Sequence, residues 1–280
     1  MYGRVTYDNE NVYLNGQRIL GVKSFDGQMG FSRTPISALG AGYLGQALEG
    51  EMPKSYSFSK YVGSSEEDLL SLAGGEITGV YKYKSNRNDF TQEWTAVRSR
   101  MSSYELSCQV GELPEASVSF EVVGAAGFSD KQVNNETEWS DEFNVIRPGD
   151  LIVSGENGFS NNRLQSFRYT ITNPVSKGNL IGGEFVSFFR QNEPVEVVIK
   201  MDFDLDSLED DLSDLPLCEK DFAATFIFNK CGNKIRAFSI SGAELIDSSV
   251  NGEVGSNATF SATYRYYEDG IEQVIASNTL

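Results

Sequence analysis

The stretch SSYELSCQVGELPEASVSFEVVG, residues 102–124, decides the fold class. Apolar side chains at Val118, Phe120 and Val122 alternate with polar ones, which is the period of a half-buried β-strand, and Gly111 supplies a turn before them. Similar alternation recurs along the chain, and Asn-Gly or Asp-Gly pairs separate the segments. Long helical patterns are missing. The sequence therefore predicts a mainly β protein of antiparallel strands, as a sandwich or barrel.

Two short helices are predicted beside the strands. In residues 64–72, and again in 207–215, a serine cap is followed by carboxylates in the first turn, where free N–H groups and the helix dipole favour them. Leu208, Leu212 and Leu215 share one face of the second segment.

The chain also aligns with itself at offsets of 139–142 residues. The aligned segments include 12–16 with 151–155, 23–25 with 165–167, 39–42 with 180–183, 94–99 with 235–240, and 116–123 with 258–265. A nearly constant offset across strands, glycine turns and helices indicates an internal duplication. We therefore expect two similar domains, residues 1–127 and 149–280, joined by an acidic linker at 128–148.

Charge and histidine content exclude several function classes. The chain has 23 basic and 40 acidic side chains, a net charge of −17, and residues 1–100 hold 11 of each sign, so the excess lies in 101–280. A chain this acidic lacks the excess of basic side chains that proteins use to bind the phosphates of nucleic acids. Histidine is absent, which removes mechanisms that need an imidazole. No carboxylate pair is singled out for hydrolysis, so we expect no enzymatic activity and no cofactor.

Two motif-like patterns have plainer interpretations. Residues 40–45 match G-x-G-x-x-G, but no buried strand precedes them, so a turn or close backbone approach is predicted instead of a dinucleotide site. Asp202, Asp204 and Asp206 begin like a calcium loop, but Ser207 stands where the sharp turn needs glycine. A solvated strand face is predicted there, with a weak divalent-cation site as the alternative.

The cysteines and the hydropathy pattern add two expectations. Cys108, Cys218 and Cys231 are too few and too scattered for a disulfide scaffold or a zinc site, so reduced, partly buried thiols are predicted. No stretch approaches the roughly 20 apolar residues of a membrane helix, so we expect no membrane insertion.

The stretch at 102–124 also carries a family resemblance. A first strand ending in NG, the segment GVKSFDGQMGFSRTPISALGAG (21–42), the strand YSFSKYV (56–62), a short acidic helix and the closing hairpin together resemble the tail tube (major tail) proteins of long-tailed bacteriophages. The second repeat resembles them more loosely, at 164–183 and 250–267.

The resemblance implies a fold and a structural role. It implies two tandem tail-tube-like β-sandwich domains, each with a short flanking helix, whose inner strands join those of neighbouring copies into a β-barrel ring around a channel. Three chains would give a ring with pseudo-sixfold symmetry, so a trimer is favoured over a hexamer. The protein would be a virion component of the phage tail, assembled in the host bacterial cytoplasm.

The resemblance also implies partners and candidate residues. The partners are other copies in rings and stacked rings, tail proteins such as the tape measure and tube terminator, and double-stranded DNA only in passage. The candidate ring-stacking residues are Pro35, Leu39, Gly40, Gly42, Tyr43, Pro174, Leu180, Gly182, Gly183 and Phe185. The candidate acidic residues of the lumen or surface are Asp202, Asp204, Asp206, Glu209 and Asp210.

A second function class stays open on the sequence. Trp94, Trp139 and the 13 tyrosines could line a sugar-binding face of a carbohydrate-binding or adhesin β-sandwich, at a tail tip or another surface. Aromatic residues are equally expected inside strands, so core packing is the favoured interpretation.

Overall fold

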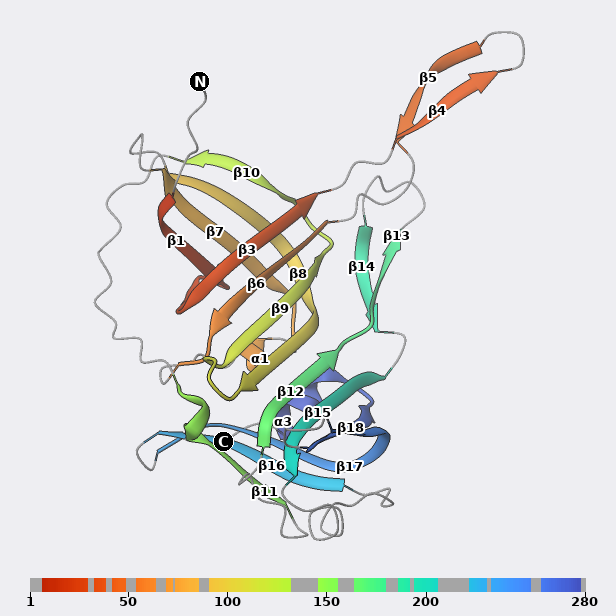
Figure 1. Cartoon of the computed structure of the whole chain (residues 1–280). Helices are drawn as coiled ribbons and strands as arrows, with labels where there is room; N and C mark the ends of the chain where they lie inside the picture. The colour runs from red at the N-terminus through yellow and green to blue at the C-terminus, as the bar shows by residue number, and fades with distance from the viewer. Residues whose placement is uncertain are drawn as a thin grey trace.

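The computed structural model describes residues 7–29, 33–38, 42–48, 54–63, 69–72, 74–85, 91–131, 146–155, 164–179, 186–191, 194–205, 222–230, 233–252 and 258–277. This part of the chain is mainly β, with large antiparallel sheets, so the predicted fold class is confirmed at that level (Figure 1). We call residues 7–131 the first half and residues 146–277 the second half.

Each half contributes a series of strands and little helix. The first half holds β1 (Tyr7–Leu14), β2 (Gln17–Ile19), β3 (Val22–Met29), β4 (Arg33–Ala38), β5 (Gly42–Leu48), β6 (Lys54–Tyr61), α1 (Leu69–Leu72), β7 (Ile77–Ser85), β8 (Thr91–Gln109), β9 (Glu115–Val122) and β10 (Ala126–Lys131). The second half holds a 3-10 turn (Pro148–Asp150), β11 (Leu151–Gly155), β12 (Leu164–Thr172), β13 (Val175–Asn179), β14 (Val186–Gln191), β15 (Val195–Leu205), β16 (Phe222–Lys230), β17 (Asn233–Asn251), β18 (Ala258–Glu268) and α3 (Ile271–Ser277).

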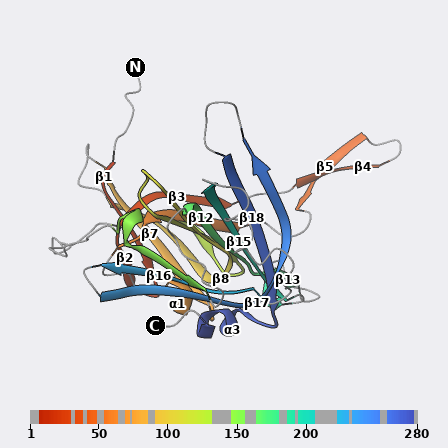
Figure 2. The same cartoon turned by 60° about the horizontal axis from the view of Figure 1, so that its bottom comes forward.

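The two halves pair their strands in the same order. In the first half the order is β1-β7-β8-β9-β6-β3, and in the second half it is β11-β16-β17-β18-β15-β12. Each half also has a separate hairpin at the matching place in the chain, β4–β5 and β13–β14. The first of these hairpins projects from the body of the molecule (Figures 1 and 2).

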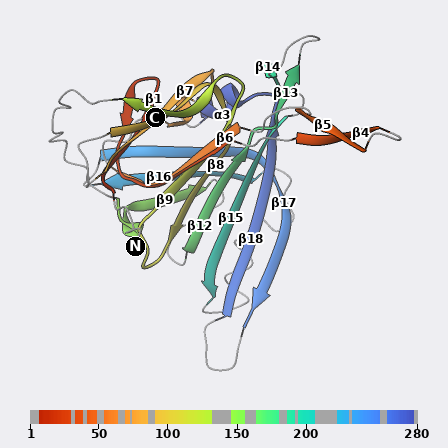
Figure 3. The ribbon, with the colours of Figure 1, turned by 90° about the horizontal axis from the view of Figure 1, so that it is seen from above.

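One sheet is continuous across the two halves. Strand β12 pairs with β15 of its own half and, along its other edge, with the C-terminal part of β8. In that contact Thr172 lies opposite Ser103, and Phe167 lies opposite Cys108. Seen from above, β9, β8, β12, β15, β18 and β17 lie side by side, with β17 outermost (Figure 3).

The long strands β8 and β17 have the same design. Each is 19 residues long and changes partners near a residue with positive φ, Arg98 (φ 57°) in β8 and Gly242 (φ 70°) in β17. The N-terminal part of each strand pairs with β7 or β16, and the C-terminal part with β9 or β18. Arg98 and Gly242 therefore mark equivalent positions, 144 residues apart.

Matching aromatic contacts hold the cores of the two halves. In the first half the Phe25 and Tyr81 rings stack with centroids 4.2 Å apart, and in the second half Phe167 and Phe226 stack at the same distance. The two pairs join equivalent strands, β3 to β7 in the first half and β12 to β16 in the second half. Stacked rings at this spacing add to the stability gained from burying their apolar area.

Side chains at equivalent positions of the two halves differ in size but fill similar space as pairs. Trp94 is buried over Gly27, where an added Cβ would lie 2.8 Å from the tryptophan Cε2. The equivalent pair in the second half is Phe238 and Tyr169, whose ring centroids are 4.8 Å apart. A larger ring opposite glycine and a smaller ring opposite tyrosine fill similar space, as close packing requires. The sequences of the halves can therefore diverge while their packing stays similar.

The predicted alignment and helices are partly corrected. The alignment of 94–99 with 235–240 is wrong by three residues. Each long strand has a bulge near Arg98 or Gly242, and matching these bulges makes Trp94 equivalent to Phe238 instead of Ile235. In the segment predicted as a helix at 64–72, the described end, Leu69–Leu72, is helical, whereas 207–215 lies outside the described residues. The helix α3 was not predicted.

The boundaries of the expected linker can be compared only in part. Strand β10 runs past residue 127 to Lys131 and pairs with β8. Ile146, near the other end of the expected linker, is fully buried. Residues 132–145 lie outside the described part of the chain.

Candidate functional site: the polar face of the continuous sheet

The continuous sheet has one apolar face and one polar face. In β6 the side chains of Tyr56 and Phe58 are buried, whereas those of Ser55, Ser57 and Ser59 point to the other side and are half-buried. The strand pleat produces this alternation, and the register carries it from strand to strand. We call the face that carries these serines, over β3, β6, β9, β8, β12, β15, β18 and β17, the polar face.

Small hydroxyl side chains dominate the polar face. The register aligns Ser57 with Ser119, and Ser119 with Ser103, so that a row of serines runs across three strands. The hydroxyl residues that the pairing places on this face are Ser24, Ser55, Ser57, Ser59, Ser103, Ser107, Ser117, Ser119, Ser166, Thr170, Thr172, Ser249, Thr259, Ser261 and Thr263. Such short side chains project little from the sheet and offer hydroxyl groups for hydrogen bonding.

Carboxylates outnumber basic groups on the polar face in both halves. In the first half the face carries Asp26, Glu105, Glu115 and Glu121 against Lys23 and Arg100. In the second half it carries Glu196, Asp202, Asp204, Glu244 and Asp247 against Arg168, Lys200 and Arg265. Each half thus has two more acidic than basic groups, although the charge of the whole chain is concentrated in its C-terminal part. The face is more evenly acidic than the sequence indicates.

Two ion pairs at this face link the first half to the second half. Arg168 of β12 lies 3.6 Å from Glu105 of β8, so one pair bridges the two halves. Lys177 of the β13–β14 hairpin lies 2.6 Å from Glu121 of the first half. Surface pairs of this kind contribute little stability but favour one register of the strands.

The predicted acidic residues are only partly described. Asp202 and Asp204 lie on β15, on the polar face, and the Asp202 carboxylate accepts hydrogen bonds from the hydroxyls of Ser166 and Ser261 on the flanking strands. Asp206, Glu209 and Asp210 lie outside the described residues. Within the described part of the chain, no group of three or more histidine, cysteine, aspartate or glutamate residues is placed to hold a metal ion.

The candidate stacking residues fall mainly on the two separate hairpins. Pro35 lies in β4, Gly42 and Tyr43 lie in β5, and Pro174 lies between β12 and β13. Residues 42–45 of the G-x-G-x-x-G segment lie in strand β5, whereas residues 40 and 41 lie outside the described residues, so the expected turn is not tested. The remaining candidates, Leu39, Gly40, Leu180, Gly182, Gly183 and Phe185, lie outside the described residues.

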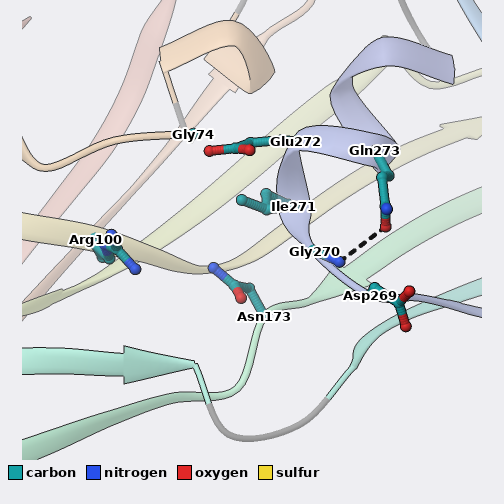
Figure 4. Close-up of a pocket in the computed structure, with 8 residues that line it drawn as sticks. All are labelled: Gly74, Arg100, Asn173, Asp269, Gly270, Ile271, Glu272 and Gln273. Atoms are coloured by element: carbon teal, nitrogen blue, oxygen red, sulfur yellow. Dashed lines mark hydrogen bonds between the residues drawn. The ribbon is translucent and has the colours of Figure 1, made fainter.

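A pocket of about 350 Å³ lies where the two halves meet, lined by residues of β8, the end of β12 and the start of α3 (Figure 4). Asn173 holds this junction, because its side-chain amide donates to the Met101 carbonyl and its backbone N–H donates to the Ser102 carbonyl, both at 2.8 Å. The lining combines Arg100 with the carboxylates of Asp269 and Glu272, so its charges favour neither an anionic nor a cationic ligand.

Two sequence-based candidates lie in the core. Trp94 is 2% exposed and packs edge-on against Tyr56 and Phe25, which removes it from any sugar-binding face, while Trp139 lies outside the described residues. Cys108 is a free, buried thiol, and burial raises its pKa to about 11. It is therefore protonated at neutral pH, and Cys218 and Cys231 lie outside the described residues.

Comparison with known proteins adds no relative. No protein-family model matches the chain, and no curated protein matches it. Among the described helices, none is long and apolar enough to cross a membrane.

Proposed function

We propose that this protein is the repeating subunit of a bacteriophage tail tube, in which copies close into rings and rings stack around a channel for double-stranded DNA. The observation that carries the proposal is the polar face, a single sheet surface that extends through both halves and is rich in hydroxyls and carboxylates. The resemblance of residues 102–124 and their flanking segments to tail tube proteins supports it.

The chemistry of the polar face suits a surface past which DNA moves. Duplex DNA carries about one negative charge per 1.7 Å of axis, so a basic channel would hold it through many salt-dependent contacts. An acidic, hydroxyl-rich surface repels phosphates over roughly a Debye length of 8–10 Å and keeps water between the two. DNA would therefore slide through such a channel instead of binding to it.

The matching strand orders support a ring of three chains. If each half is one tail-tube-like β-sandwich, as the resemblance implies, three chains supply six similar units around the channel. Rings would then contact one another through loops and hairpins such as β4–β5, and other tail proteins would close the two ends of the tube. The protein would assemble in the host cytoplasm and function in the virion.

Electron microscopy and mass measurement of the purified protein test this proposal. Hollow rings or tubes should form as the concentration rises, and the smallest closed species should have the mass of three chains. A protein that stays monomeric at every concentration, and forms no ring or tube, would overturn the proposed function. A closed species of six chains would contradict the proposed trimeric ring but not the proposed function as a tube subunit.

Binding to short duplex DNA tests the role of the polar face. Assembled wild-type protein should show no binding at physiological salt, whereas Glu105→Lys in the first half and Asp204→Lys in the second should each introduce salt-dependent binding. Each new lysine–phosphate contact should steepen the slope of log K against log salt by about 0.9. Strong, salt-sensitive binding by the wild-type protein would contradict a channel that lets DNA slide.

A further inference from the structure

Two strand edges of the continuous sheet have no partner among the described strands. Strand β3 pairs with β6 along one edge only, and the segment Glu244–Asn251 of β17 pairs with β18 along one edge only. They stand at opposite ends of the order β3-β6-β9-β8-β12-β15-β18-β17. Unpaired edges of this length present rows of free N–H and C=O groups, which favour pairing with another strand.

The two halves of the chain already form a contact between strands equivalent to these two edge strands. The equivalent strands are β12, which corresponds to β3, and β8, which corresponds to β17, and these two pair with each other across the halves. Phe25 and Phe167 fix the first correspondence, and Arg98 and Gly242 fix the second. The β12–β8 pairing is therefore an internal template for a contact between β3 and β17.

We propose that β3 of one copy pairs antiparallel with the C-terminal part of β17 of the next copy, in the register of the β12–β8 contact. Transferring that register places Gln28 opposite Ser249, Asp26 opposite Asn251, and Gly27 opposite Val250. The inference rests on the proposed function, because it specifies the lateral contact that would close the ring. The partner is a second copy of this chain.

Side-chain exposure supports this partner. Leu106 and Ile171, on the apolar face of the internal contact, are fully buried. Their equivalents at the open edges, Val250 and Met29, are 45% and 39% exposed. Val250 faces the same side as the buried Phe260 opposite it, and no described strand lies along the other edge of this part of β17. A second copy would bury both side chains and extend the apolar core across the joint.

The backbone groups at the two edges are complementary. In the internal contact and its continuation, the Val110 N–H donates to the Gln165 carbonyl and the Asn173 N–H donates to the Ser102 carbonyl. Even-numbered residues of β8 and odd-numbered residues of β12 therefore direct their main-chain groups toward each other. The equivalent residues are also even in β17 and odd in β3. Gln28 and Ser249 thus form a non-hydrogen-bonded pair, the closer of the two antiparallel spacings.

Disulfide cross-linking tests the register. With Gln28→Cys and Ser249→Cys in one chain, mild oxidation should give covalent oligomers on a non-reducing gel, since paired Cβ atoms at this spacing suit a disulfide. The matched control, Asp26→Cys with Ser249→Cys, uses the same strands and the same face but is displaced by two residues, and it should cross-link at least tenfold more slowly. Each single variant and the wild-type chain measure cross-linking through the native cysteines.

The outcomes separate this inference from the proposed function. Rapid cross-linking of the 28/249 pair alone supports the contact and its register. Rings in the electron microscope without 28/249 cross-linking, or with faster 26/249 cross-linking, would overturn the contact and leave the tube standing. If the double variants and the wild-type protein remain monomeric at every concentration, the proposed function fails and the contact fails with it.

Discussion

The two long strands β8 and β17 differ in what lies beside their C-terminal parts. Both are 19 residues long and change partners at a residue of positive φ, but β8 has β9 on one edge and β12 on the other, whereas β17 has only β18 among the described strands. Leu106 of β8 is consequently fully buried, and Val250, its equivalent in β17, is 45% exposed. Burial here depends on the neighbouring strand more than on the side chain itself.

The same charge placed at these two positions should therefore have very different effects. Leu106→Asp puts an unpaired carboxylate into the core and should lower the free energy of unfolding by on the order of 3–5 kcal/mol, enough to unfold much of the protein. Val250→Asp should change the stability of the monomer by less than about 1 kcal/mol and yet prevent ring formation. Urea denaturation measures the first effect, and the mass of the oligomer measures the second.

The control for this comparison is Val250→Ile, which keeps an apolar side chain at the open edge and should assemble normally. Rings formed by Val250→Asp would show that this edge stays exposed after assembly. Equal loss of monomer stability in the two aspartate variants would show that β17 is already as well covered as β8.

Changing the pair Gly27 and Trp94 should have the next largest effect on stability. Gly27→Ala should lower the free energy of unfolding by about 1–3 kcal/mol, because the new methyl group meets the Trp94 ring. In a Trp94→Phe background the cost should fall by on the order of 1 kcal/mol, since the second half places Phe238 beside a much larger residue at the matching position.

This cycle is best measured by urea denaturation in the Val250→Asp background, so that assembly does not contribute to the measured stability. Tyr56→Phe serves as a control, because it keeps the ring opposite Gly27 and removes only the hydroxyl that is hydrogen-bonded to Ser99. If the losses of unfolding free energy from Gly27→Ala and Trp94→Phe are additive, the two residues do not interact energetically. The similar packing of the two halves would then not depend on this pair.

The sequence predicted the strands better than their partners. Alternation identified β9 and β15 because one face of each is buried, and it placed Asp202 and Asp204 on the other face. The β12–β8 contact could not be read from the sequence, because pairing between distant strands depends on edges that form only after each half has folded.

Two local sequence patterns indicate features that the prediction missed. Ile271, Val274 and Ile275 have the spacing of one helix face, but the preceding Asp-Gly pair was interpreted as a hairpin turn. The serines of the polar face follow the same period of two as the apolar residues, so their shared face could have been predicted. The self-alignment is wrong by three residues at β17, where the strand registers and the positive-φ residues identify the equivalent positions.

The smallest expected effect concerns those positive-φ residues. Gly242 adopts φ 70° without a side chain to oppose it, whereas Arg98 adopts φ 57° and its guanidinium donates two hydrogen bonds to the Glu76 carboxylate, at 2.9 and 3.2 Å. This contact lowers the pKa of Glu76. The pair therefore stabilises the fold above the ordinary glutamate pKa of about 4.3, and the contribution is lost as the pH falls through the lower value of the folded state.

Arg98→Gly should consequently be judged by its pH dependence. At pH 7 the variant gains from the relaxed backbone and loses the ion pair, so the two effects oppose each other. Between about pH 5 and pH 3 the wild-type protein loses the ion pair as well, and the stability of the variant relative to wild type should rise. Gly242→Ala, which strains the backbone and breaks no ion pair, should be less stable than wild type by roughly 1 kcal/mol at every pH in this range. A relative stability of Arg98→Gly that does not change with pH would show that Glu76 gives Arg98 no support at this position. The difference between Arg98 and Gly242 would then lie in the backbone conformation alone.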